Sequence, residues 1–430
     1  MKFSYILVVA ALVFGAGCKK SAGGFSHNAS EPITVSAFSP ASGPFGTELL
    51  IKGSNFTGDT SKVKVTINGV PLTVVGVDGD EIMVAVTAKT GSGPVVVSID
   101  GKTGTSASSY AYVYSYSVST LAGSGTAGFN DGIGTGASFN FNGVRGQLCV
   151  DTALNVYVAD GGNQRVRKIA ADGTVSTIAG NGTNGYADGA GAAAEFNNPC
   201  GTVLDANGNL YVSERNGHHI RMITPDGVVS TYASGSGNGT NELTSVVVNK
   251  KTGAVYWSDF YGNGVYALKG GVITQVINHS LPCTLAIDAS GNIYATQYDD
   301  EQVWKYTYDA VNDVFDNGVA IAGTSHVAGM VDGVGLAATF ARPWGIALDG
   351  GGNLYVSGQG GGDNSNCVRR LSAGDWTVTT IAGVGDNTGN LDGLGTDARF
   401  NQPTGIAIDK NNDMYILDMG NNLVRKIAVK

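Results

Sequence analysis

The chain has 430 residues, of which 65 are glycine and 14% are charged, and its formal net charge is −9. Glycine is about twice as frequent as the roughly 7% of an average protein, so the composition predicts many tight turns and few charged helices. The length fits two domains, and the acidic balance, without any Lys/Arg run longer than two, argues against nucleic acid as a partner.

The N-terminus has the features of a secretory signal peptide, which we place at residues 1–17. Lys2 provides the positive start, and the apolar run of residues 3–14 is too short to span a bilayer. The small residues Gly15-Ala16-Gly17 then form a cleavage site. The sequence therefore predicts export.

Cys18 follows these small residues directly, and a polar tether of residues 18–31 comes next. This order resembles a bacterial lipobox, which implies that Cys18 is the lipid attachment site. The alternative is a plain secretory peptide with an incidental cysteine. Lys19 and Lys20, with no Asp beside Cys18, favour the outer membrane. We expect a surface-exposed protein that reaches the membrane through its N-terminal lipid alone.

Residues 32–115 show alternating apolar runs spaced like the strands of a β-sandwich. The opening FSPASGPFGTELLIKGSNF is followed by KVKVTING, PLTVVGV, EIMVAVTA and GPVVVSIDG. These segments resemble an IPT/TIG domain, which is a small immunoglobulin-like sandwich. The resemblance implies a spacer or protein-contact module without catalytic residues.

Residues 116–430 repeat one pattern six times, from NVYVADGGNQRVRKI at residues 155–169 to DMYILDMGNNLVRKI at residues 413–427. Each copy holds two alternating runs joined by a polar turn, which is typical of antiparallel strands in a hairpin. A strand ending in Asp or Asn precedes each hairpin, and a fourth strand such as TVSTIAG usually follows. Six units of four strands predict a β-propeller.

The same segments resemble NHL repeats, which implies a six-bladed propeller. YSVSTLAG, at residues 116–123, has no strands of its own before it, whereas the last copy, LVRKIAVK, lacks a fourth strand. We therefore predict that the N-terminal strand completes the last blade and closes the ring. The predicted fold class is all-β, an immunoglobulin-like sandwich followed by a six-bladed propeller, and we expect a monomer.

Four glycine-rich inserts connect the fourth strand of one repeat to the first strand of the next. Each contains an Asp-Gly pair, at Asp131, Asp188, Asp332 and Asp392. Calcium sites are one interpretation, but each loop supplies few further carboxylates for an ion that needs six to eight oxygens. We favour the interpretation that each Asp accepts backbone N–H groups and pins its loop. The phenylalanine that ends each insert then fills the gap between blades: Phe139, Phe196, Phe340 and Phe400.

Asp160, Asn163 and Arg167 form a set that recurs at the C-terminus. Because it repeats at equivalent positions, we assign it to the fold rather than to catalysis. Asp and Asn are expected to close the hairpin turn, and Arg is expected on the outer strand. The four cysteines after Cys18 lie in different repeats, and we expect buried thiols rather than disulfides or metal ligands: Cys149, Cys200, Cys283 and Cys367.

The first strands of the repeats start at the mouth of the predicted channel, with these residues in ring order: Gly146, Cys200, Thr244, Cys283, Trp344 and Thr404. Trp344 is the one bulky aromatic, and it could stack on a sugar with Arg145 and Arg342 as neighbouring donors. Thr244 and Thr404 would add hydroxyl groups. The alternative is that Trp344 fills the channel and that nothing binds there.

Related six-bladed enzymes imply two tests of activity. Amidating lyases hold zinc through several histidines, and the five histidines here form no three-ligand shell in the sequence. Lactonase-like hydrolases hold calcium through acids on inner strands, where this chain has none before the terminal Asp or Asn. We therefore expect no catalytic residue, no metal and no cofactor, although a divergent hydrolase or lyase remains the alternative.

The favoured function is a lipid-anchored binding protein, similar to the IPT/TIG plus NHL lipoproteins of Bacteroidetes that accompany polysaccharide uptake. In this hypothesis the sandwich is a spacer, and the propeller binds an oligosaccharide or an outer-membrane partner protein. A pure protein scaffold stays open as a third possibility.

Overall fold

The computed structural model of the protein describes residues 27–141, 143, 145–235, 241–358 and 365–430. The predicted signal peptide and lipid attachment site, Cys18, lie outside these residues. The chain divides into two compact units between Tyr114 and Ser115, and each unit has its own core. Over the ranges that the structure describes, no helix is long and apolar enough to cross a membrane.

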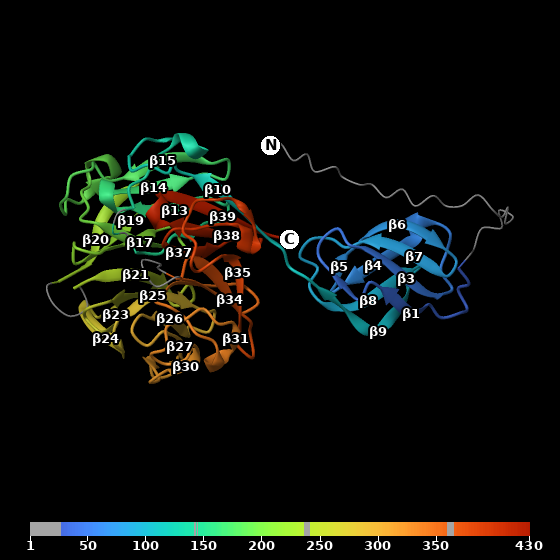
Figure 1. The fold of residues 1–430 in the computed structure, drawn as a ribbon. Helices are drawn as coiled ribbons and strands as arrows, with labels where there is room; N and C mark the ends of the chain where they lie inside the picture. Colours follow the sequence, from blue (N-terminus) through green and yellow to red (C-terminus); the bar gives the residue numbers. More distant parts are fainter. Residues whose placement is uncertain (1–26, 142, 144, 236–240, 359–364) are drawn as a thin grey trace. The chain divides into compact units, whose positions relative to one another are not determined.

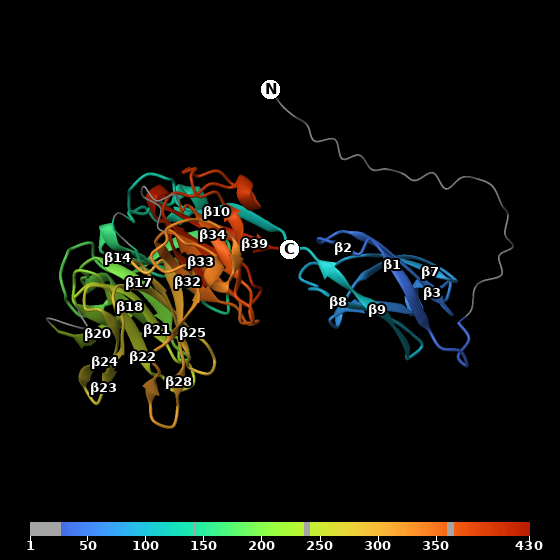
Figure 2. The same ribbon diagram turned by 60° about the horizontal axis from the view of Figure 1, so that its bottom comes forward.

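The first unit is a sandwich of two sheets, whose strands can be followed in Figure 2. One sheet has the order β1-β3-β7-β6, with strands Thr34–Ser39, Glu48–Ser54, Glu81–Ala85 and Thr73–Asp78. The other has the order β2-β9-β8-β4-β5, with strands Ser42–Gly43, Lys102–Tyr112, Gly93–Ile99, Val63–Ile67 and Val70–Pro71. A single-turn 3-10 helix, η1, spans Thr60–Lys62.

Alternation of side chains along the strands builds the sandwich core. In β8, Val95, Val97 and Ile99 are fully buried, while the alternating residues Pro94, Val96 and Ser98 are exposed or partly exposed. This is the period of two that a strand with one buried face requires. Ile51 and Tyr110, from different sheets, complete the same apolar cluster.

The second unit consists of six β-sheets around a common centre, as Figure 1 shows. Blades 1 to 3 contain β12 to β15 (Cys149–Val150, Val156–Asp160, Arg165–Ile169, Thr174–Ala179), β17 to β20 (Pro199–Leu204, Leu210–Glu214, His219–Ile223, Val228–Ser234) and β21 to β24 (Leu243–Val248, Val255–Asp259, Gly264–Lys269, Val272–Asn278). Blades 4 and 5 contain β25, β26, β27 and β30 (Pro282–Ile287, Ile293–Gln297, Gln302–Tyr306, Val319–Ala322) and β32 to β35 (Pro343–Leu348, Leu354–Gly358, Cys367–Leu371, Thr377–Gly383). Blade 6 contains β37, β38, β39 and β10 (Pro403–Ile408, Met414–Asp418, Leu423–Val429, Tyr116–Ala122). The predicted six-bladed propeller is thus confirmed.

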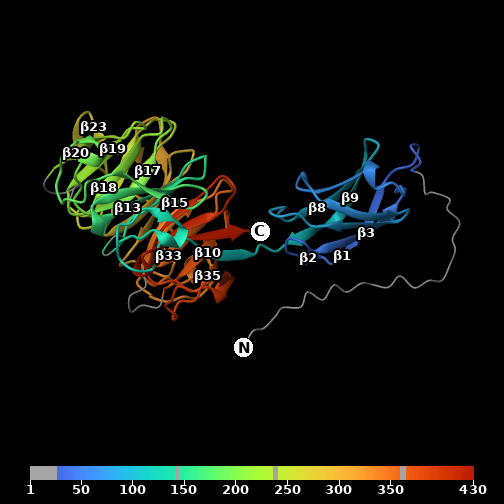
Figure 3. The ribbon, with the colours of Figure 1, turned by 90° about the horizontal axis from the view of Figure 1, so that it is seen from above.

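The ring closes as predicted. β10 pairs antiparallel with β39, and the register sets Tyr116 opposite Val429 and Val118 opposite Ile427. The first strand of the propeller therefore lies beside the last strand of the chain, as Figure 3 shows. Val118 is buried in a cluster with residues of blades 5 and 6. The fourth strand of the last blade consequently comes from the opposite end of the domain.

Four blades contain a fifth strand that the sequence did not predict. Each glycine-rich insert adds a two-residue strand to the outer edge of the blade that follows it. These strands are β11 (Gly132–Ile133), β16 (Gly189–Ala190), β31 (Gly333–Val334) and β36 (Gly393–Leu394), each followed by a 3-10 turn: η2 (Gly134–Gly136), η4 (Gly191–Ala193), η5 (Gly335–Ala337) and η6 (Gly395–Asp397). Among the described residues, blades 3 and 4 have four strands, and blade 4 carries an additional hairpin of β28 (Tyr308–Asp309) and β29 (Val314–Phe315).

The phenylalanine that ends each insert packs between two blades, as predicted. Phe139 is fully buried and shares a cluster with Val156 of blade 1 and Leu417 of blade 6. Phe196 lies in the same way between blades 1 and 2. Burying a side chain of this size contributes about 1.5–3 kcal/mol, so the inserts stabilise the contacts between blades.

In blades 2 to 6, the first strand begins where the second strand of its blade ends. Pro199 pairs with Glu214, and Pro343 pairs with Gly358. The starts of the inner strands and the turns between second and third strands therefore share one face of the propeller. We call this the mouth face.

Candidate functional site

The recurring Asp and Arg residues form a buried ion network. The Arg167 guanidinium lies 2.7 Å from an oxygen of Asp160 and 2.7 Å from an oxygen of Asp131. Arg167 and Asp160 are fully buried, and the ring of Phe139 lies against the guanidinium at 5.2 Å. The prediction that Arg167 lies on an outer strand is wrong, because it belongs to β14, the third strand. From β14, the Arg167 guanidinium links Asp160 at the hairpin turn to Asp131 in the insert.

The insert carboxylates anchor the loops, as we favoured. Besides its arginine, each accepts a backbone N–H from the outer strand: Asp131 from Thr177, Asp188 from Thr231, Asp332 from Thr380, and Asp392 from Thr120, at 2.9–3.2 Å. A guanidinium therefore occupies the place beside each carboxylate that the calcium interpretation would give to an ion. The network recurs with Arg221, Arg369 and Arg425, so it belongs to the fold.

Blade 2 contains a variant of the network. Glu214 replaces the aspartate at the end of the second strand and is fully buried. Burial raises the pKa of Glu214 to about 7, although Arg221 and the amide of Asn197 act in the opposite direction. Its Oε1 accepts the Asn197 N–H at 2.8 Å, but the Arg221 guanidinium is 3.5 Å away. The pairing is looser than in blade 1.

The inner strands pack backbone against backbone near the axis. A Cβ on Gly146 would lie 2.1 Å from the carbonyl oxygen of Cys200, and one on Gly345 would lie 2.0 Å from that of Thr404. Either contact is impossible for a real side chain, so these positions require glycine. Elsewhere a hydroxyl reaches the next blade instead: Thr244 donates to the carbonyl of Cys283 at 2.6 Å.

The Gln147 side chain crosses the middle of the ring. Its Oε1 accepts a hydrogen bond from the Ser245 hydroxyl of blade 3 at 2.9 Å, and its Nε2 donates to the Ile346 carbonyl of blade 5 at 3.4 Å. Gln147 precedes β12, which has two residues where the other inner strands have six. The segment before β12 thus obstructs the channel below the mouth face.

Trp344 follows Pro343, the first residue of the inner strand β32, at the mouth face and is fully buried. Its Nε1 donates to the carbonyl of Arg145. Phe260 and Tyr298 contact the indole with centroid distances of 5.6 and 5.9 Å, and the Arg145 guanidinium lies 5.5 Å from its centre. A sugar could stack on Trp344 only by displacing one of these groups. The structure therefore places Trp344 in a buried cluster with Phe260 and Cys283, and its role in binding stays a prediction.

The other predicted site residues divide into two groups. Thr244 and Thr404 are fully buried. The Thr244 hydroxyl donates to the carbonyl of Cys283, whereas the Thr404 hydroxyl has no hydrogen-bond partner among the described residues. Arg145 and Arg342 are partly exposed on the mouth face. The Arg342 guanidinium lies 5.2 Å from the ring centre of Tyr298. The structure thus brings the two arginines, but not the two threonines, to an accessible surface.

Three aromatic residues that sequence reasoning missed extend this surface. Phe260 contacts Tyr261 and Tyr298 edge to face, with centroid distances of 5.1 and 5.6 Å. Tyr298 is partly exposed, and Tyr261 is 59% exposed. We call Phe260, Tyr261, Tyr298 and Arg342 the aromatic shelf. The turns of blades 3 and 4 carry these rings where blade 1 has Gly161 and Gly162, and this departure from the repeat was the available signal.

In the part of the chain that the structure describes, no three His, Cys, Asp or Glu side chains gather as a metal site would require. Cys200, Cys283 and Cys367 are buried free thiols, as predicted, and Cys149 is partly buried. Burial raises the pKa of Cys200 to about 11. These thiols are therefore neutral and inert at ordinary pH.

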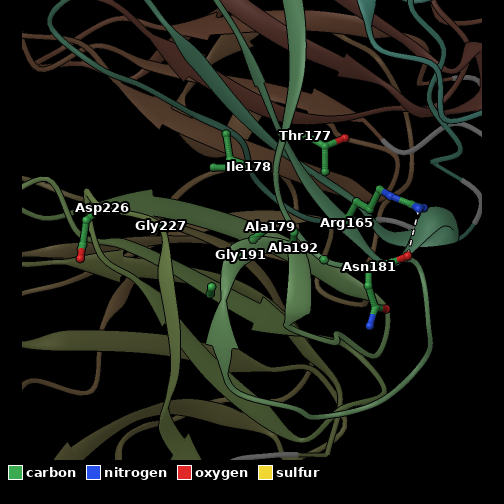
Figure 4. A pocket seen from close by; sticks show the side chains of 11 residues that line it. Arg165, Thr177, Ile178, Ala179, Asn181, Gly191, Ala192, Asp226 and Gly227 are labelled. Atoms are coloured by element: carbon green, nitrogen blue, oxygen red, sulfur yellow. Dashed lines mark hydrogen bonds between the residues drawn. The ribbon is translucent and has the colours of Figure 1, made fainter.

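A pocket of about 520 Å³ lies away from the shelf, between the outer strand of blade 1 and the insert of blade 2. Figure 4 shows residues that line it, among them Thr177, Arg165 and Ala192, and Arg165 donates to the carbonyl of Asn181 at 3.1 Å. A counterpart of about 280 Å³ lies at the insert of blade 6, where Thr380 replaces Thr177. Because the pocket recurs with the repeat, we assign it to the fold.

The fold and the mouth face define an all-β protein in which an IPT/TIG sandwich precedes a six-bladed propeller of NHL type. Residues 32–116 match the family model of the IPT/TIG domain. NHL repeat-containing protein 2 of Bos taurus is 25% identical over 303 residues, which make up 66% of this chain and 38% of the bovine protein. The chain thus spans well under half of that relative.

Two solved structures from Bacteroides thetaiotaomicron VPI-5482 share the whole architecture. The first, a structural genomics protein of unknown function, has a TM-score of 0.67 and 22% identity, and the match covers 94% of this chain and 100% of that one. The second, described as an auxiliary nutrient binding protein, has a TM-score of 0.60 and 22% identity, with 94% and 99% covered. At this identity the likeness establishes the fold.

Proposed function

We propose that this protein is a binding protein displayed on the outer membrane by a lipid on Cys18, and that its propeller holds a glycan on the mouth face. The observation that carries the proposal is the aromatic shelf. It combines partly exposed rings with the Arg342 guanidinium at one place on the ring. Aromatic faces beside polar donors are the usual means of recognising sugar rings.

The position of the shelf supports a binding role. Blades 1, 2, 5 and 6 share the Arg network and the insert strand, whereas blades 3 and 4 have four-stranded sheets with Tyr266 and Trp304 in the arginine position. Phe260, Tyr261 and Tyr298 come from these two divergent blades. Because a single ligand cannot contact six equivalent blades equally, we favour the side where the repeat diverges. The auxiliary nutrient binding protein of similar fold is consistent with such a role.

Affinity electrophoresis of the full chain, made soluble by Cys18→Ser, tests the glycan proposal. The gels contain xylan, mixed-linkage β-glucan, galactan, α-mannan or chondroitin sulfate. We expect at least one polysaccharide to retard the protein, and Arg342→Ala to weaken the retardation. Arg399→Ala, on the insert of blade 6, is the matched control and should have no effect. A protein that no polysaccharide retards would remove the glycan proposal.

The anchoring proposal has its own experiment. Cells that express the wild-type chain are labelled with an alkyne fatty acid and fractionated. We expect label on the wild type in the membrane fraction, and neither label nor membrane association for Cys18→Ser. Protease treatment of intact cells then reports whether the propeller faces outward. An unlabelled wild-type protein would contradict lipid anchoring without affecting the glycan experiment.

A further inference from the structure

The turn between the second and third strands of blade 3 presents a ring to solvent. It follows Asp259 and carries Phe260 and Tyr261. Phe260 is 7% exposed and points into the cluster with Trp344, whereas Tyr261 is 59% exposed. Phe260 therefore holds the turn in place through its buried ring, whereas the neighbouring Tyr261 ring extends into solvent.

This turn is held by hydrogen bonds from several directions. Asp259 is fully buried and accepts the Gly262 N–H at 2.7 Å. Phe260 N–H donates to the carbonyl of Glu242 at 2.9 Å, and the Tyr266 hydroxyl donates to the carbonyl of Gly262 at 2.6 Å. A Cβ on Gly262 would lie 2.1 Å from the Asp259 carboxylate, so a larger residue there would have to displace that side chain. The backbone beneath Tyr261 is therefore fixed before any ligand arrives, which lowers the entropy lost on binding.

Tyr261 is exposed to solvent, and buried side chains lie beneath it. The exposed Tyr261 ring contacts Phe260, which in turn contacts Tyr298. The Arg342 guanidinium lies over the Tyr298 ring. Beneath them Trp344 is fully buried, and Gln147 crosses the channel axis. Among the described residues, the shelf thus presents the exposed Tyr261 ring above a floor of buried side chains.

We infer, on the basis of the proposed glycan function, that the aromatic shelf binds an internal stretch of an extended polysaccharide chain, with Tyr261 as the stacking residue. A site that recognises a chain end or a small sugar encloses it and needs a deep pocket. An open platform instead contacts successive sugar units, so affinity grows with chain length until the shelf is covered. The free end of the chain makes no contact.

The test uses an oligosaccharide series, from disaccharide to octasaccharide, cut from whichever polysaccharide retards the full chain. Calorimetry should show affinity that increases through the series and is unchanged when the reducing end is converted to an alditol. Tyr261→Ala should weaken binding of the longest member by about tenfold or more, whereas Tyr261→Phe should retain it, because stacking needs the ring and not the hydroxyl. Tyr186→Ala, which removes a tyrosine that is 48% exposed on blade 2, is the control and should bind normally.

The outcomes distinguish a failure of the shelf as the binding site from a failure of the proposed glycan function. If the polysaccharide binds but Tyr261→Ala matches the wild type, the shelf is not the site, and the glycan function survives elsewhere. If affinity is already maximal with the disaccharide, or falls when the reducing end is altered, the site recognises an end and the inference is wrong. If no polysaccharide binds at all, the proposed function fails and the inference fails with it. Because Tyr261 is exposed, its variants should keep the wild-type melting temperature.

Discussion

The imidazole ring of His279 meets the indole ring of Trp304 edge to face, with centroids 4.4 Å apart. In blade 2 the same two positions hold Phe196 and Arg221, because the registers of β18–β19 and β26–β27 align Arg221 with Trp304. Phe196 precedes its inner-strand proline by three residues, as His279 does. Blade 4 has therefore exchanged the aromatic and basic members of the pair. The contact survives although both residues differ.

The hydrogen bond between His279 and Tyr306 predicts that the two residues contribute to stability in a coupled way. The buried Tyr306 hydroxyl lies 2.5 Å from His279 Nδ1, and Asp300 lies 2.8 Å from Nε2. His279→Ala should lower the free energy of unfolding by about 1–3 kcal/mol, because a buried hydroxyl loses a partner. Tyr306→Phe should then cost less than in the wild type. Denaturant unfolding of the four proteins measures the coupling, and equal costs in both backgrounds would contradict it.

Removing Arg167 should destabilise the propeller strongly. Arg167→Ala leaves Asp160 buried without its cation, and we expect a loss of about 3–5 kcal/mol in unfolding free energy. Arg165→Ala is the matched control two residues away. Its side chain is partly exposed and bonds to backbone carbonyls, so we expect about 1 kcal/mol or less. Thermal and denaturant melts measure both, and similar losses would show that the buried network matters little.

Glu214 should make stability depend on pH. Its pKa is raised from 4.5 to about 7, so the folded state binds this proton more tightly than the unfolded state. The contribution of the carboxyl to stability is present at low pH and is lost as pH rises from about 5 to 7. Glu214→Gln cannot ionise, so its stability relative to the wild type should increase between pH 5 and pH 8. A difference that stays constant over this range would show that the carboxyl does not titrate there.

Ring closure can be tested on β10. Val118 is buried at the seam between blades 5 and 6, whereas Ser119 is exposed. Val118→Asp places a charge in that cluster and should cost about 3 kcal/mol or more of unfolding free energy. Ser119→Asp should cost little. If limited proteolysis and melting temperature do not distinguish the two variants, closure through β10 contributes little to stability.

The repeat made the fold predictable, because six copies of one alternating pattern determine both strand number and strand order. The unmatched strand of residues 116–123 likewise predicted the pairing with Leu423–Val429 that the structure contains. The two-residue strands at Gly132–Ile133 and its equivalents were not predictable, since two residues carry no period. Arg167 and Asp131 lie 36 residues apart, and no local pattern indicates that they meet.

The mouth face was harder to predict than the blades. The position of Trp344 at the start of an inner strand was correct, but its burial depends on Phe260 and on the Arg145 carbonyl, which come from two other blades. Whether a turn residue such as Tyr261 points outward is decided by the residue beside it, because Phe260 takes the inward position. These contacts are non-local, so neither composition nor spacing contains them.

Hydrogen–deuterium exchange of the full chain, with and without a saturating polysaccharide that retards it, locates the glycan site. We expect protection on the mouth face, at residues 259–263 of blade 3 and around Tyr298 of blade 4. The turns on the opposite face, such as residues 249–253, should exchange as in the free protein. Protection confined to that opposite face, or to the sandwich of residues 32–114, would contradict a glycan site on the mouth face.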